Sequence, residues 1–148
     1  MKPEPTRFLG VAAGHLMLKT AAALGPGYEQ SSVSVIGLML TQLADEFDRA
    51  ASRRIEENRE LRRIFAQAAE VVTIADLRAK LAKAASGEDE SLTVSALEQN
   101  NCELRALLIA LHVHVEELDS QAARDLEAEI WRELVTSTER RKLGIGPF

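Results

Sequence analysis

The chain has 148 residues, the size of one ordinary domain, and carries a formal net charge of −5. Leu and Ala together supply 42 of these residues, whereas aromatic residues make up only 4% and there are just 8 Gly and 4 Pro. This composition favours helices and argues against a β-sandwich or β-barrel. The acidic balance argues against nucleic acid as a partner, and a single cysteine excludes an internal disulfide.

The first apolar segment, residues 6–24, predicts an amphipathic helix with Thr6 as its N-cap, ended by the Gly-Pro-Gly turn at 25–27. A cleaved signal peptide is the alternative, disfavoured because His15 and Lys19 interrupt the apolar run. No stretch reaches the roughly 18 uncharged apolar residues of a membrane-spanning helix. We therefore expect no membrane partner and a cytoplasmic protein, in keeping with its unpaired cysteine.

The second predicted helix is the longest, at about residues 32–71. Its apolar residues recur every three or four positions, as on one face of a helix. They are Val33, Ile36, Leu40, Leu43, Phe47 and Ala50, and then Leu61, Phe65, Ala68 and Val72. A helix of that length measures about 60 Å, more than the roughly 38 Å diameter of a compact globule of this size. We therefore expect a spine that other helices line, or an overhang that another subunit covers.

Three further helices follow in the pattern. A short one is expected at about 74–86, a fourth from a start between Ser91 and Ser95 to about Leu118, and a fifth from Ser120 to a point before Gly144. The sequence shows no internal repeat and no low-complexity linker. It therefore predicts an all-α protein, an antiparallel bundle of about five helices in a single domain over residues 1–148.

Polar residues interrupt two of the apolar stripes. Arg54 and Asn58 fall on the stripe of the long helix, Asn101 falls on that of the fourth helix, and Glu57 is adjacent. A buried polar group costs several kcal/mol unless it is paired. This layer of four residues is therefore a candidate ligand-binding pocket between helices. The alternatives are a structural layer that fixes helix register, or an exposed end of the bundle.

Motifs for metal binding or catalysis are not found. His112 and Glu116 share a helix face and come nearest to a metal site, but further ligands would have to come from other helices. The paired Glu/His motifs of di-iron bundles and the zinc-protease motif are absent. Cys102 has no neighbouring histidine to activate it. We expect no metal, no cofactor and no catalytic residue.

Candidate interface residues lie at the two ends of the chain. Gly10 and Gly14 form a small-residue surface that would allow close approach of a helix from the same chain or from a second subunit. Trp131 is expected in the core, and would become the first candidate for an interface hot spot if it were exposed. Arginines between residues 49 and 63 alternate with acidic residues, which is typical of a solvated helix face.

These patterns favour a non-enzymatic helical bundle that acts through protein–protein contacts, as a homodimer. The alternative is a bundle that binds a small molecule or cofactor in the polar layer, as an enzyme or an accessory subunit of one.

Overall fold

The computed structural model describes residues 4–142, and all regular secondary structure within that range is helical. Its elements are α1 (Pro5–His15), the π-helical turn η1 (Leu16–Thr20), α2 (Ala21–Ala23), α3 (Tyr28–Ala68), α4 (Ala75–Ala85), α5 (Val94–Glu116) and α6 (Gln121–Arg140). Because α1, η1 and α2 follow one another without a break, they correspond to the first predicted helix. The all-α prediction with one long helix is confirmed.

Helix boundaries differ from the predictions by a few residues. The N-cap position of the first helix is Glu4, not Thr6, and the Glu4 side chain makes no capping hydrogen bond. Pro5 occupies the first helical position, so Thr6 already lies inside the helix. Helix α3 begins at Tyr28, directly after the Gly-Pro-Gly turn, and runs 41 residues. Ser120 caps α6 as expected, since its Oγ accepts a hydrogen bond of 3.1 Å from the backbone N–H of Ala123.

The chain forms two compact units that divide within α3, between Ala50 and Ala51. The hairpin unit comprises residues 1–50 with 143–148, of which the structure describes 4–50. The bundle unit comprises residues 51–142. The expectation of a single domain stays a prediction.

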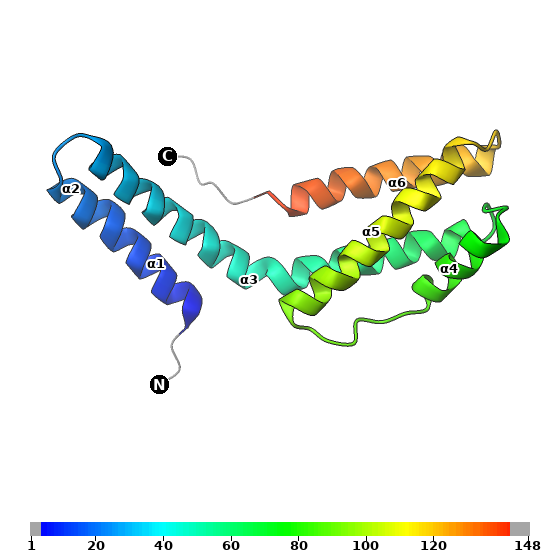
Figure 1. Cartoon of the computed structure of the whole chain (residues 1–148), viewed down its shortest axis with the longest axis horizontal. Coiled ribbons are helices and arrows are strands. Elements are labelled where there is room, and N and C mark those ends of the chain that lie inside the picture. The colour runs from blue at the N-terminus through cyan, green and yellow to red at the C-terminus, as the bar shows by residue number, and fades with distance from the viewer. Residues whose placement is uncertain (1–3, 143–148) are drawn as a thin grey trace. The chain divides into compact units, whose positions relative to one another are not determined.

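The bundle unit has a large apolar core. Helices α4, α5 and α6 pack against the second half of α3 (Figure 1). Each helix contributes residues that recur every three or four positions, which is why the sequence pattern predicted this face. The core includes Leu61, Ile64, Phe65, Val72, Leu81, Leu104, Leu108, Leu111, Val115, Leu126 and Ile130.

The hairpin unit is built differently, with α1, η1 and α2 lying antiparallel to the first half of α3 (Figure 1). A Cβ placed on Gly37 would lie 2.4 Å from Cγ of Met17 and 3.2 Å from the carbonyl oxygen of Ala13. The two helices therefore approach closely at Gly37, inside α3. At Gly10 and Gly14 a Cβ would meet nothing within 4 Å, so neither marks a close helix approach among the described residues.

Gly37→Leu is expected to lower the stability of the hairpin unit by about 1–3 kcal/mol, because the added side chain has no space between the helices. Faster amide hydrogen exchange of α1 would measure this loss. Ser31→Leu, at an exposed position of the same helix, is the control. Equal exchange rates in the two variants would show that the close approach at Gly37 is absent in solution.

The two halves of the apolar stripe of α3 differ in burial. Leu61 and Phe65 in its second half are buried, whereas Ile36, Leu43 and Phe47 in its first half are exposed. Those three residues are exposed because, among the described residues, the hairpin unit has no third helix to cover them. Within residues 4–142, no helix is both long and apolar enough to cross a lipid bilayer.

Candidate functional site

The polar layer predicted from the sequence lies inside the bundle unit. Glu57, Asn58 and Asn101 are each at most 1% exposed. The amide nitrogen of Asn101 donates hydrogen bonds to Oδ1 of Asn58 at 2.9 Å and to Oε2 of Glu57 at 3.3 Å. Three of the four predicted residues are thus joined directly by hydrogen bonds between α3 and α5.

Arg141, at the C-cap of α6, completes the layer. Its Nε donates to Oε1 of Glu57 at 2.9 Å and its Nη2 to Oε2 at 2.5 Å, which is a two-pronged pairing of guanidinium with carboxylate. Nη2 also donates to Oδ1 of Asn101 at 3.1 Å. The hydroxyl of Ser137, one turn earlier on α6, donates to Oε1 of Glu57 at 3.1 Å. Helices α3, α5 and α6 therefore meet at one carboxylate.

Glu57 is held as the carboxylate anion. Burial raises the pKa of Glu57, but the hydrogen bond and positive charge of Arg141, the hydroxyl of Ser137 and the charge of Arg105 outweigh burial. The net pKa of Glu57 lies below its ordinary value. Arg105 also donates to the hydroxyl of Ser137 at 3.2 Å, so the second partner of Glu57 is itself positioned by a hydrogen bond.

Arg54, the fourth predicted residue, pairs with Glu98 of α5. Its side chain is 14% exposed and that of Glu98 is 41% exposed, so this ion pair lies nearer the surface than the Glu57 carboxylate. The polar layer therefore extends from a buried centre toward solvent along α3 and α5.

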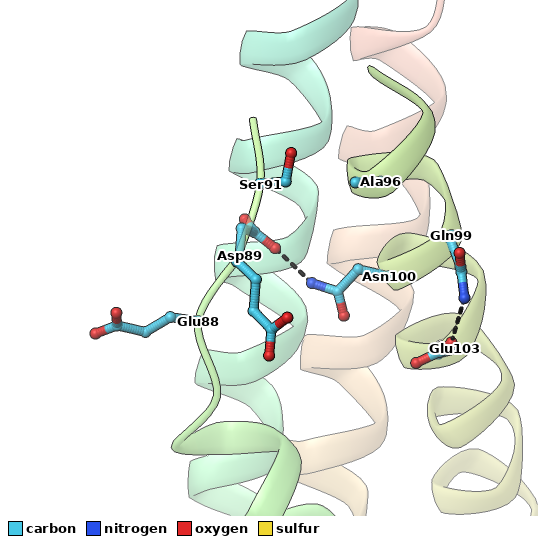
Figure 2. Close-up of a pocket in the computed structure, with 8 residues that line it drawn as sticks. Glu88, Asp89, Ser91, Ala96, Gln99, Asn100 and Glu103 are labelled. Atoms are coloured by element: carbon cyan, nitrogen blue, oxygen red, sulfur yellow. Dashed lines mark hydrogen bonds between the residues drawn. The ribbon is translucent and has the colours of Figure 1, made fainter. Parts of the chain in front are cut away.

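A second branch of the layer fixes the connection between α4 and α5. The Asn58 amide nitrogen donates to Oδ1 of Asp89 at 3.0 Å, and Arg62 Nη2 donates to the same oxygen at 2.9 Å. Asn100 donates to it as well (Figure 2). Burial raises the pKa of Asp89, but these donors outweigh burial and leave the pKa of Asp89 below its ordinary value. The loop is thus tied to α3 by a largely buried anion.

Next to this branch lies a surface cavity of about 340 Å³. It is lined by Glu88, Asp89, Glu90, Ser91, Ala96, Gln99, Asn100 and Glu103 (Figure 2). Gln99 and Glu103 form a hydrogen bond to each other at 3.3 Å on the exposed side of α5. None of the four residues of the predicted ligand-binding layer lines this cavity.

The other predicted residues lie elsewhere. His112 and Glu116 share a face of α5, with His112 Nε2 3.6 Å from a Glu116 carboxylate oxygen. Trp131 is 52% exposed, so the expectation that it belongs to the core is wrong; its ring stands edge-on to His112, with ring centroids 5.2 Å apart. Cys102 is exposed and free.

Sequence reasoning missed the residues of α6 and the loop in this network. Arg141 follows the last apolar position of α6 and reads as a charge that suits a helix C-terminus. Asp89 stands in a run of acidic residues that reads as a polar connector. The sequence signal is that Glu57, Asn58 and Asn101 fall on or beside apolar stripes, where a buried polar group needs a partner.

No family model, curated protein or solved structure matches this chain.

Proposed function

We propose that this chain is a non-enzymatic protein that acts through protein–protein contacts and forms a homodimer through its hairpin unit. The observation that carries the proposal is the contrast between what the hairpin unit buries and what it exposes. In the described residues 4–50, the buried residues are small: Ala13, Ala21, Gly37, Ala44 and Ala50.

The large apolar side chains of the same unit are mostly in contact with water. Nine of them are between 48% and 84% exposed: Phe8, Val11, Leu18, Tyr28, Val35, Ile36, Met39, Leu43 and Phe47. They occur on both helices of the hairpin. A monomeric protein rarely exposes so many large apolar side chains in one short unit, and extended apolar surfaces are typical of interaction sites.

A second copy of the chain is the proposed occupant. Two antiparallel hairpins supply four helices, which is the common bundle in which each helix can cover the apolar side of its neighbours. A stable interface removes about 800 Å² per partner from water, and nine large side chains that are 48% to 84% exposed are enough to provide surface of that order. Gly10 and Gly14, where an added Cβ would meet nothing within 4 Å, leave room for a partner helix to approach.

The alternative, a small-molecule or cofactor site in the polar layer, has less support. Glu57, Asn58 and Asn101 form hydrogen bonds to one another and to Arg141, so a ligand would have to replace bonds already made. The exposed, free Cys102 favours a reducing compartment, and we therefore propose a cytoplasmic protein.

Sedimentation equilibrium tests the dimer. Wild-type protein at micromolar concentration is expected to have twice the mass of the chain, and the double substitution Leu43→Glu with Phe47→Glu to weaken the dimer at least 100-fold. The physical reason is that four carboxylates would enter one apolar interface without partners. Both positions are more than half exposed in the single chain, so the charges leave the folded monomer intact.

Val135→Glu is the matched control, because Val135 is a 61% exposed apolar residue of α6 beside the alternative hot spot Trp131. It should leave the dimer unchanged. A wild-type protein that sediments as a monomer at tens of micromolar contradicts the proposal. A dimer lost in Val135→Glu and kept in the double variant would assign the interface to α6.

A further inference from the structure

A cluster of potential metal ligands lies where the last turns of α5 pass the first half of α6. It consists of His112 and Glu116 of α5 and Glu127 of α6. One ligand atom from each residue lies within 4.8 Å of the others. The sequence pattern supplied the first two residues, and the packing of α5 against α6 adds the third.

The histidine of this cluster has an unused coordinating atom. Nε2 of His112 is shielded from solvent and has no hydrogen-bond partner among the described residues. This Nε2 lies 3.6 Å from Oε1 of Glu116, which is beyond hydrogen-bond distance. A buried nitrogen without a hydrogen bond costs free energy, and a metal ion between the nitrogen and the two carboxylates would satisfy it.

We propose that His112, Glu116 and Glu127 bind a divalent transition-metal ion, with Zn²⁺ as the expected occupant. One imidazole and two carboxylates are a ligand set that zinc accepts, and tetrahedral zinc places its ligand atoms about 3.3–3.5 Å apart. The separation of 3.6 Å between His112 and Glu116 is close to that value. Glu116 is exposed and Glu127 is half-buried, so side-chain rotation can bring both carboxylates closer to His112.

The bound ion would join α5 to α6 and leave a fourth coordination position to water. The site lies in the bundle unit, so it is independent of the dimer proposed above for the hairpin unit. Zinc would also stabilise the fold, because an ion that binds only the folded state shifts the unfolding equilibrium by mass action.

The single tryptophan provides a direct measurement. Because the Trp131 ring stands edge-on to His112 at 5.2 Å, a Co²⁺ ion bound to His112 will quench its fluorescence. Titration with Co²⁺ is expected to quench Trp131 with saturation at one equivalent. Zn²⁺ should reverse the quenching by competition, and EDTA should abolish it. Zn²⁺ should also raise the melting temperature by several degrees.

Substitutions decide whether these three residues are the ligands. His112→Gln and Glu127→Gln should each weaken Co²⁺ binding at least tenfold, because each removes a ligand. His15→Gln is the matched control, an exposed histidine of the hairpin unit, and Cys102→Ser excludes binding by the free thiol. Glu127→Gln keeps the size of the side chain, so any loss of binding comes from the lost carboxylate. Circular dichroism of each variant without metal shows whether the fold is kept.

Two results would overturn the proposal. One is wild-type fluorescence that shows no saturable quenching below millimolar Co²⁺. The other is binding by Glu127→Gln that equals that of the wild type, which would place the ion away from α6.

Discussion

Glu57→Ala is expected to lower the free energy of unfolding of the bundle unit by about 3–5 kcal/mol, the range for breaking a buried ion pair. The substitution removes the carboxylate on which Arg141, Ser137 and Asn101 converge. Asn101 is fully buried, so its amide would lose a hydrogen-bond partner that water cannot replace. Arg141 is 39% exposed and can be rehydrated in part, which keeps the expected loss near the lower end of the range.

Urea unfolding followed by the fluorescence of Trp131 measures this loss, because the single tryptophan lies in the bundle unit and reports on that unit. Glu56→Ala is the control. Glu56 is the preceding residue of α3, its side chain is 58% exposed, and its contact with Arg140 spans 3.6 Å. Its removal is expected to change stability by less than about 1 kcal/mol. If the two variants unfold at the same urea concentration, the buried network does not stabilise the bundle unit.

The hydrogen-bond network around Glu57 also shows which residues of a site the sequence can predict. The 3.6-residue period placed Asn58 and Asn101 on buried faces, because their neighbours at helical spacing are apolar. The same period cannot predict which helix end supplies a cation to Glu57, since that depends on how α6 packs against α3. Arg141 and Asp89 stand in charged segments whose local sequence is indistinguishable from a solvated surface.

The long helix illustrates the same limit for the fold. Its existence follows from spacing, and its N-terminal boundary follows from the Gly-Pro-Gly turn. Whether its apolar stripe is covered does not follow, because burial depends on the number of helices that lie beside each half. Four helical segments share the bundle unit, whereas residues 4–50 of the hairpin unit form two antiparallel arms.

Two phenylalanines of α3 allow this difference in burial to be tested. Phe47 and Phe65 are 18 residues apart, which is five helical turns, so the sequence pattern places them on the same face. Phe65 is fully buried and Phe47 is 59% exposed. Phe65→Ala is therefore expected to lower the free energy of unfolding of the bundle unit by about 3–5 kcal/mol, the usual result of emptying an aromatic site in a core.

Phe47→Ala is the matched variant, with the same residue type on the same helix. It should leave the free energy of unfolding reported by Trp131 within about 0.5 kcal/mol of the wild type, because a largely exposed side chain leaves no cavity. Phe47→Ala is expected instead to weaken the dimer and so to lower the mass measured by sedimentation, because it removes an aromatic anchor of the proposed interface. A loss of bundle stability in Phe47→Ala as large as in Phe65→Ala would mean that the first half of α3 is covered in the same way as the second. The exposed stripe would then no longer support a dimer through the hairpin unit.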